Sequence, residues 1–279
     1  TAPQGTVALG AGSATTLTFN GSKLIGMQVD QGVVDSLVEN KGLIRADGGV
    51  VMMSAGARNE LLASVVNNYG SIEANTVDNH EGSITLLAGM NVGVINVGGT
   101  LEASATSGGN GGFIKTSAAN VKIENNAHVT TAATSGATGT WLIDSNNFAI
   151  DAGSATRVGS GIGAATLASA LSTTSVNITT SATNTSTELS DINVNAAVTW
   201  NTNKLTLTAH NDININAVMT ANKNTDGQNN ASLNLQPGSN GNVITSRNPD
   251  GRFKGRVDFF QADGITARSG DGFLTIGAN

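Results

Sequence analysis

The sequence predicts an all-β protein, a right-handed parallel β-helix built from one chain of 279 residues. Two observations carry this prediction: short segments recur along the chain, and each segment alternates apolar and polar residues with period 2. The composition is the third, with 35 Gly, 4% aromatic residues and 12% charged residues. Few aromatics and many small β-branched side chains suit a thin core of stacked Ile, Val, Leu and Ala.

The clearest repeat pairs residues 33–46, VVDSLVENKGLIRA, with residues 61–74, LLASVVNNYGSIEA, at an offset of 28. A shorter copy, GGTLEA, ends at Ala103, at an offset of 29 from Ala74. Other segments interleave with these: GVVMMSAG (49–56), GSITLLAG (82–89), GFIKTSA (112–118), and DINVNA (191–196), which returns as DININA (212–217) at an offset of 21. Segments that return at intervals of roughly 20–30 residues describe the coils of a solenoid.

Equivalent positions of successive coils should stack, because one coil cannot bury its apolar row alone. The offsets place three side chains in one interior column, Ile44, Ile72 and Leu101. Their neighbours should lie outside the column on adjacent coils, Arg45, Glu73 and Glu102. At about 4.8 Å per coil and around twelve coils, the solenoid should be roughly 55–60 Å long. The alternative is an antiparallel sandwich or barrel, which also uses many short strands but favours two-residue hairpins.

The whole chain, 1–279, is predicted to be a single β-helix segment that is turn-rich and less regular at about 222–256. Three segments have the i, i+4 apolar spacing of short helical turns that decorate a solenoid. They include Val33 to Val38, Leu61 to Val66, and AATLASAL (164–171). Both terminal regions contain short strand-like runs without an obvious polar cap. Further coils or another copy stacked end to end should therefore cover the ends, unless terminal residues fold back as caps.

Net charge and cysteine content restrict the partners. The net charge of −6 disfavours a nucleic-acid partner, because phosphate recognition needs a basic surface. Cysteine is absent, which excludes disulfides and zinc-thiolate sites. No apolar run approaches the ~18–20 residues needed to span a bilayer, so the chain is not expected to be membrane-spanning.

Several linked motifs resemble one family. They are GGNGGFIKTSA (108–118), TWLIDSNNFAI (140–150), IGAATLASAL (162–171) and DINVNAAVTWNTNKLTLTAHNDININA (191–217). Together they resemble the filamentous-haemagglutinin-like exoproteins of two-partner secretion, over roughly residues 33–217. The TWLID block is similar to the Trp-Leu-(Leu/Ile)-Asp-Pro block of the high-molecular-weight adhesins, with Ser145 where Pro is usual.

The resemblance implies a parallel β-helix that a dedicated outer-membrane two-partner-secretion transporter exports and that is secreted or displayed at the bacterial cell surface. Members of the family act in adhesion, biofilm formation, contact-dependent inhibition or haem acquisition. Residues 1–32 do not reproduce the Asn-Pro-Asn-Gly pattern of the secretion module. The chain is therefore interpreted as a segment just downstream of that module.

Candidate catalytic groups are sparse. Asp78, His80 and Glu81 lie together beside a glycine, which favours a solvated turn, and His210 with Asp212 is interpreted in the same way. His128 has no acidic neighbour in the sequence, and no metal-ligand spacing occurs. GSGIG (159–163) lacks the Gly-x-Gly-x-x-Gly spacing of a dinucleotide loop. We expect no catalytic residue, no cofactor and no metal.

One local concentration of basic residues occurs in the sequence, formed by Arg247, Arg252, Lys254 and Arg256. They are either a contact for an anionic glycan or partner, or an ordinary solvated turn with nearby aspartates. Three aromatics could stack on sugars but are interpreted as packing residues, Trp141, Trp200 and Tyr69.

The sequence therefore predicts a non-enzymatic structural or adhesive segment that contacts surface glycans or receptors on host or neighbouring cells. Two alternatives stay open. One is a carbohydrate-active β-helix enzyme, a lyase or glycosidase, which would need clustered carboxylates on one outer face. The other is the stalk of a contact-dependent toxin-delivery protein.

Overall fold

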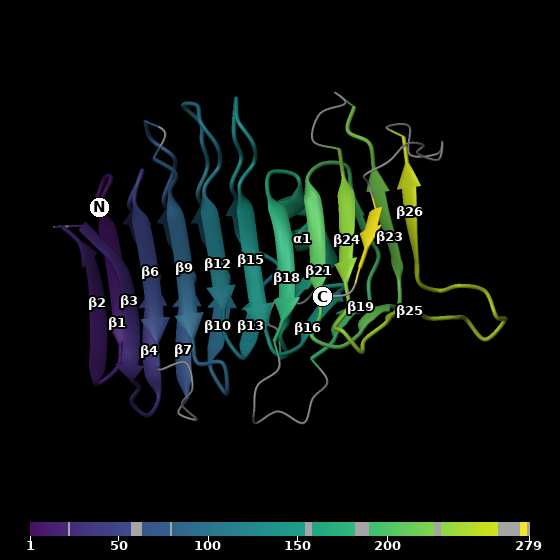
Figure 1. Cartoon of the computed structure of the whole chain (residues 1–279), viewed down its shortest axis with the longest axis horizontal. Coiled ribbons are helices and arrows are strands. Elements are labelled where there is room, and N and C mark those ends of the chain that lie inside the picture. Colours follow the sequence, from purple (N-terminus) through teal and green to yellow (C-terminus); the bar gives the residue numbers. More distant parts are fainter. Residues whose placement is uncertain are drawn as a thin grey trace.

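The computed structural model describes residues 1–21, 23–56, 63–78, 80–153, 158–181, 190–225, 230–261 and 274–277. These residues form a parallel β-helix (Figure 1), as the repeats predict, and the helix has three sides. Every pairing between named strands is parallel except the pairing of β2 (Ala14–Asn20) with β3 (Lys23–Gln31). No helix in the described part of the chain is long and apolar enough to cross a membrane.

Sheet 1 has nine strands and forms the first side. Its strands, in spatial order, are β1 (Thr6–Ala11), β6 (Val50–Ala55), β9 (Ser83–Ala88), β12 (Phe113–Ser117), β15 (Thr140–Ser145), β18 (Ser175–Thr180), β21 (Lys204–Thr208), β24 (Ser232–Gln236) and β27 (Leu274–Ile276). Because spatial order follows chain order, each turn of the chain adds one strand to this sheet.

Sheet 2 forms the second side and also has nine strands. They are β4 (Ser36–Asn40), β7 (Ser64–Asn68), β10 (Val94–Val97), β13 (Asn120–Ile123), β17 (Gly161–Gly163), β16 (Phe148–Asp151), β19 (Ile192–Val194), β22 (Ile213–Ile215) and β25 (Val243–Thr245). Strand β17 lies between β13 and β16, so one coil contributes two strands to this side.

The third side combines two shorter sheets and a helix. Sheet 3 contains β5 (Leu43–Arg45), β8 (Ser71–Glu73), β11 (Thr100–Glu102) and β14 (His128–Thr130), and sheet 4 contains β20 (Val198–Trp200), β23 (Val218–Asn222) and β26 (Arg256–Phe260). Helix α1 (Ala164–Leu171) contacts both β14 and β20, so it replaces a strand between the two sheets. Its buried Leu167 and Leu171 close the core there.

The register confirms the repeat offsets. Ile72 pairs with Ile44 on one side and Leu101 on the other, which is the predicted column. Ile72 and Leu101 are completely buried, whereas Ile44 in the first coil is half-buried. Residues 192–194 pair with 213–215 at the predicted offset of 21.

Two of the three predicted helical decorations are wrong. Residues 33–38 lead into strand β4, and the described part of the second segment lies in β7, while Leu61 and Leu62 lie outside the described residues. Both strands alternate buried and more exposed positions with period 2. Adjacent apolar residues at the start of each strand therefore imitated helical spacing. The third decoration is confirmed as α1.

The predicted number of coils is too high. Sheet 1 shows nine strands among the described residues, and its eight spacings at about 4.8 Å span about 38 Å. The coils are longer than the sequence repeats indicated. Val50 pairs with Ser83 at an offset of 33, and Thr140 pairs with Ser175 at an offset of 35, because the second of these coils includes α1.

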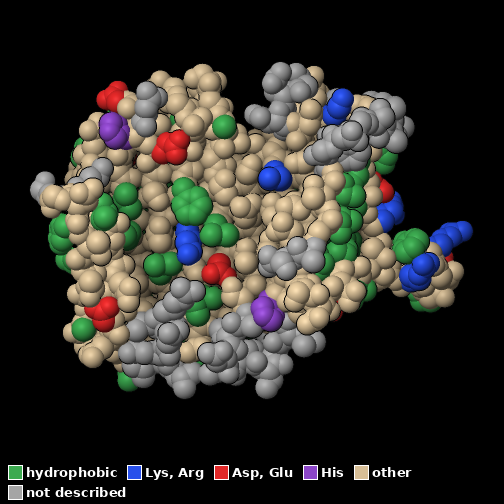
Figure 2. All heavy atoms as spheres, in the orientation of Figure 1, with side chains coloured by type: hydrophobic (Ala, Val, Ile, Leu, Met, Phe, Trp, Pro, Cys, Tyr) green, Lys and Arg blue, Asp and Glu red, His purple; other side chains and the backbone are tan. Residues whose placement is uncertain are grey.

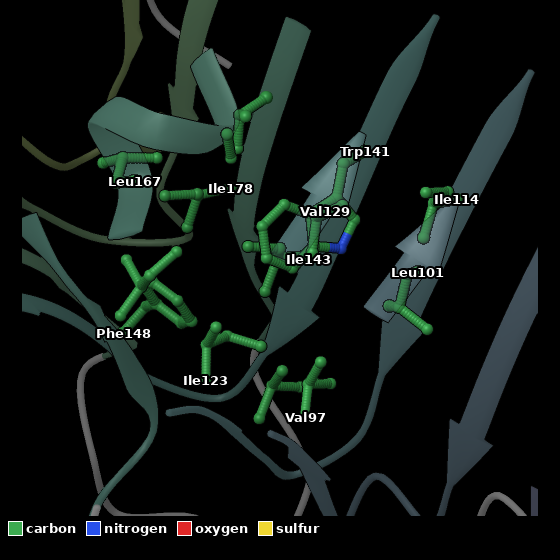
Figure 3. Close-up of a cluster of buried hydrophobic side chains, with 14 of the residues drawn as sticks. Val97, Leu101, Ile114, Ile123, Val129, Trp141, Ile143, Phe148, Leu167 and Ile178 are labelled. Atoms are coloured by element: carbon green, nitrogen blue, oxygen red, sulfur yellow. The ribbon is translucent and has the colours of Figure 1, made fainter. Parts of the chain in front are cut away.

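The core is a continuous column of aliphatic side chains with three large aromatic side chains, Trp141, Phe148 and Trp200, the first two of which are labelled in Figure 3. Trp141 and Phe148 are essentially unexposed, and the Trp141 indole N–H donates to Thr116 Oγ1 at 3.3 Å. Trp141 is therefore a packing residue, as predicted. Polar residues enter the interior where they form ladders: buried Asn68 accepts from Asn40 Nδ2 at 2.8 Å and donates to Thr100 O at 3.1 Å.

The described part of residues 222–256 contains the short strands β24 and β25 and the connections beside them. Strand β24 keeps the register of sheet 1, since Leu205 pairs with Leu233. The N-terminal edge is partly covered by residues that fold back. Ala2 N donates to Arg45 O at 2.9 Å and Gln4 N donates to Asp47 O at 2.7 Å, along the outer edge of sheet 3.

Candidate functional site

The β2–β3 hairpin covers part of the outer face of sheet 1. Met52 and Ser54 point outward from β6, yet they are only 8% and 5% exposed, whereas Thr85 and Leu87 at the paired positions of β9 are half-buried. Val29 of β3 is 4% exposed. The hairpin therefore lies on the sheet at β6 and leaves β9 and the following strands uncovered.

A groove runs where this cover ends. Its volume is about 450 Å³, and it is bordered by β3 and by the outer faces of β6, β9 and β12. We call it the hairpin groove, lined by Met27, Gln28, Val29, Ser54, Gly56, Leu87, Ala88, Met90, Lys115 and Ser117. Ligand sites usually have volumes of about 300–1,000 Å³ and combine an apolar lining with a few polar groups. The hairpin groove has a volume in this range, and its lining combines apolar side chains with an almost equal number of polar ones.

Lys115 is the cation of the hairpin groove. It points outward from β12 between the buried Ile114 and Thr116, and its ammonium forms no ion pair or hydrogen bond with any described residue. The nearest paired strand carries Asp144, but that carboxylate accepts from Ser117 Oγ at 3.0 Å and from Ser181 Oγ at 2.9 Å. Lys115 is therefore free to meet an anionic group of a ligand.

Apolar side chains surround this lysine on the open part of sheet 1. Phe113 lies two residues before it on the same face and is 40% exposed, and Leu142 is paired directly with Lys115. Figure 2 shows hydrophobic side chains gathered around a basic one over this part of the sheet. An apolar surface with one central cation fits a ligand that has an apolar body and an acidic group.

The basic residues predicted as a contact lie on a second surface. Residues 246–255 fold back on themselves: Asn248 N donates to Arg252 O, and Lys254 N donates to Ser246 O. Arg247 stacks on Phe253, with 3.9 Å between the guanidinium carbon and the ring centroid. We call this segment the basic loop, and Figure 1 shows it extending beyond β26 at the C-terminal end of the solenoid.

The structure brings together three of the four predicted basic residues. Arg252 is largely exposed and faces Asp250 at 3.8 Å, and Lys254 is exposed on the same loop as Arg247. Arg256 instead begins β26, where its Nε donates to both carboxylate oxygens of Asp258 at 2.9 and 3.1 Å. Arg256 therefore pairs with an aspartate of its own strand, and the basic loop contains the other three basic residues.

The sequence candidates for catalysis lie in turns. Asp78 has a positive φ of 49°, and its carbonyl lies 3.1 Å from His80 Nδ1. Glu81 accepts from Asn110 of the next coil at 3.2 Å. His210 is exposed, and Asp212 accepts from Asn242 N at 2.7 Å. Among the described residues, no group of three His, Asp or Glu side chains is arranged to hold a metal ion.

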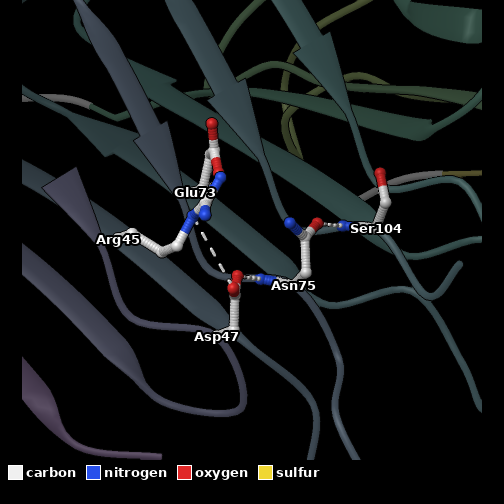
Figure 4. A network of polar contacts seen from close by, with 5 residues as sticks. All are labelled: Arg45, Asp47, Glu73, Asn75 and Ser104. Atoms are coloured by element: carbon white, nitrogen blue, oxygen red, sulfur yellow. Dashed lines mark hydrogen bonds and ion pairs between the residues drawn. The ribbon is translucent and has the colours of Figure 1, made fainter. Parts of the chain in front are cut away.

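Charged and polar side chains on the third side of the solenoid contact one another or backbone N–H groups of neighbouring coils. Glu73 accepts from Arg45 Nε at 2.6 Å, between neighbouring coils (Figure 4). Beside this pair, Asp47 accepts from Asn75 N and the Asn75 side chain accepts from Ser104 N, which links three coils. These polar groups therefore satisfy backbone donors at a corner of the solenoid.

The hairpin groove was not predicted, although the sequence contains the pattern of the hairpin that borders it. Asn20-Gly21 separates two alternating segments, which is the pattern of a tight β-hairpin, and Gly21 has a φ of 60°. Lys115 stood out in no sequence pattern, because its value as a site depends on the hairpin that folds over sheet 1.

The fold defines this chain as a β-solenoid with a three-sided core, and its described surface carries the hairpin groove and the basic loop. No family model, curated protein or solved structure matches the chain.

Proposed function

We propose that the chain is a structural and adhesive segment of a secreted bacterial surface exoprotein, with a non-catalytic role. The observation that carries the proposal is the basic loop, which extends beyond the last coil and presents Arg247, Arg252 and Lys254 to solvent. The motif resemblance to two-partner-secretion exoproteins adds the secretion route and an outer-membrane transporter as the partner in export.

The chemistry of the basic loop favours an anionic glycan at the surface of a host or neighbouring cell. Guanidinium groups bind carboxylates and sulfates through paired hydrogen bonds, and Phe253 is 51% exposed beside Arg247. The whole chain carries a net charge of −6, so the loop is a local positive site on an acidic protein. Charge attraction at such a site should depend strongly on ionic strength.

Adhesion should therefore depend on the charge of the basic loop. Beads coated with the chain should bind heparin-coated or cell surfaces, and replacing Arg247, Arg252 and Lys254 with Glu should reduce retention by about tenfold, because the cluster changes from attractive to repulsive. Retention should also fall when salt is raised from about 0.05 M to about 0.5 M. The matched control replaces three basic residues outside the loop, Lys122, Lys204 and Lys223, with Glu, which changes the net charge by the same amount. Equal retention of the loop variant and the unchanged chain would refute the glycan contact.

We also propose that copies of the chain assemble end to end. Strands β1 and β27 are the two edge strands of sheet 1. Pairing of β27 in one copy with β1 in the next would continue the parallel pairing that joins neighbouring coils within one chain. Apolar side chains are exposed at both ends: Leu17 and Phe19 are 48% and 55% exposed, and Ile276 is 59% exposed. Pairing of one end with the other does not close on itself and extends as a filament.

Light scattering of the concentrated chain should show a mass that rises with concentration, and electron microscopy should show filaments one solenoid wide. Replacing Ile276 with Lys should shift the onset of assembly to at least about tenfold higher concentration, because it places charge on the edge of sheet 1. Val158, which is 94% exposed away from these edges, supplies the control change to Lys. A chain that stays monomeric at the highest soluble concentration would rule out this assembly.

A further inference from the structure

We propose that the hairpin groove binds an extended segment of another protein, which adds as a third strand to the free edge of β3 and places a carboxylate on Lys115. This inference is independent of the adhesive function proposed above, since it concerns another surface and another ligand.

The first line of support is the free edge. Strand β3 pairs with β2 on one side, and within the described structure no strand pairs with its other side. In Figure 1, β2 lies farther from β6 than β3 does, so the edge of β3 that is not paired with β2 faces the uncovered part of sheet 1. Three consecutive residues, Met27 to Val29, line the hairpin groove, whereas alternation would bring only every second side chain to one face. The backbone edge of β3 therefore borders the groove.

The second line of support is that the central stretch of β3 lacks the usual protection of an edge strand. Natural edges carry charge, Pro or bulges that block pairing. The register of β3 shifts at Ile25 and again near Asp30, but between them Gly26 to Val29 pair regularly with β2. This stretch contains neither Pro nor charge. Its outward N–H and C=O groups form no backbone hydrogen bonds with other described segments.

The third line of support is the floor beneath that edge. A strand beside β3 would lie over the outer faces of β9 and β12, where Leu87 and Met90 are apolar and Lys115 is charged. Alternate side chains of such a strand point toward this floor. Apolar side chains would contact Leu87 and the flexible Met90, which adapts to different shapes. A Glu or Asp at the next position on the same face of the added strand would reach the unpaired ammonium of Lys115.

A two-stranded sheet is marginally stable by itself, and a third strand is normally needed for independent stability. Addition of a strand would also bury more of Met27, which is half-buried. The occupant is therefore defined by its chemistry: an extended, β-branched segment with apolar side chains on one face and one carboxylate among them.

The test uses three blocked hexapeptides labelled with a dye. The first alternates Val and Thr with a central Glu, the second has Lys in place of the Glu, and the third is the first peptide with N-methyl groups on the alternate amides that would face β3. Fluorescence anisotropy against the whole chain should show binding of the Glu peptide. The Lys peptide should bind at least about fivefold more weakly, as expected for one partly enclosed ion pair. The N-methyl peptide should not bind, because it cannot donate to β3.

A charge exchange makes the test specific to this site. The Lys115→Glu variant should reverse the order of the Glu and Lys peptides, whereas Lys122→Glu, on the outer side of β13 in sheet 2, should leave the order unchanged. Hydrogen exchange should show new protection of the Gly26 to Val29 amides when the Glu peptide is bound. Circular dichroism of each variant confirms that the solenoid is intact.

Several results would overturn the proposal. They are equal binding of the N-methyl peptide, unchanged exchange of the β3 amides, or the same peptide order in Lys115→Glu. Competition by a uronate oligosaccharide without amide protection would assign the groove to a sugar. A change of oligomeric state in Lys115→Glu without peptide would assign it to a second copy of the chain.

Discussion

Replacing Ile72 with Asp is expected to destabilise the solenoid by about 4 kcal/mol or more, because it buries a carboxylate without a partner. Ile72 is completely buried in β8 and lies between Ile44 and Leu101 of the neighbouring coils. In a stack of coils, a fault in one coil weakens its contacts with both neighbours. Thermal unfolding followed by circular dichroism should show a large fall in the midpoint, or a variant that does not fold.

The adjacent residue provides the matched control. Glu73 accepts from Arg45 at the surface, and Arg45 remains about half exposed. Replacing Glu73 with Ala should therefore cost less than about 1 kcal/mol, since an exposed ion pair is screened by water and salt. Unfolding midpoints that fall equally in the two variants would contradict the assignment of interior and exterior faces.

Repeats predicted the register of the solenoid because stacking requires like positions to pair. The offset of 28 between residues 33–46 and 61–74 is the pairing of β4 with β7 and of β5 with β8. The number of coils was less predictable, because connections vary in length without changing the stack. An interruption such as α1 adds residues to a coil while occupying the place of one strand on the third side.

Local sequence alone did not separate strand from helix where apolar residues cluster. Val33 and Val34 are 41% and 71% exposed, although their spacing with Leu37 and Val38 imitates a helical face. Pairing with β7 decides the conformation, and a partner strand that lies a whole coil further along the chain is invisible to a local pattern. Helix α1 was predictable because its small residues and two leucines lie in one uninterrupted segment.

The two candidate binding surfaces also differ in how far the sequence alone could predict them. The basic loop was predictable, since Arg247, Arg252 and Lys254 are close in sequence and remain close in space. The ion pair between Arg256 and Asp258 forms at the start of β26, so it depends on where that strand begins. The hairpin groove combines residues 27–29 with Lys115, which only the fold brings together.

Glycines at the corners of the solenoid lead to the second large expected effect. Gly42, Gly70 and Gly99 occupy equivalent positions in successive coils, each just before a strand of sheet 3. Ser71 N donates to Gly42 O at 2.8 Å, and Thr100 N donates to Gly70 O at 2.9 Å. A Cβ on Gly99 would lie 2.0 Å from Gly70 O, so the backbones approach too closely for any side chain.

Replacing Gly99 with Ala is therefore expected to cost about 3 kcal/mol, because backbone atoms of two coils must move apart and the hydrogen bond between them weakens. Gly42 is the matched control, since it has the same place in the first coil but no heavy atom lies within 4 Å of its added Cβ. Gly42→Ala should change stability by less than about 0.5 kcal/mol. Urea unfolding of both variants measures the difference. A similar small change in both would show that the corner has room for a methyl group, and that close backbone stacking does not explain why glycine recurs there.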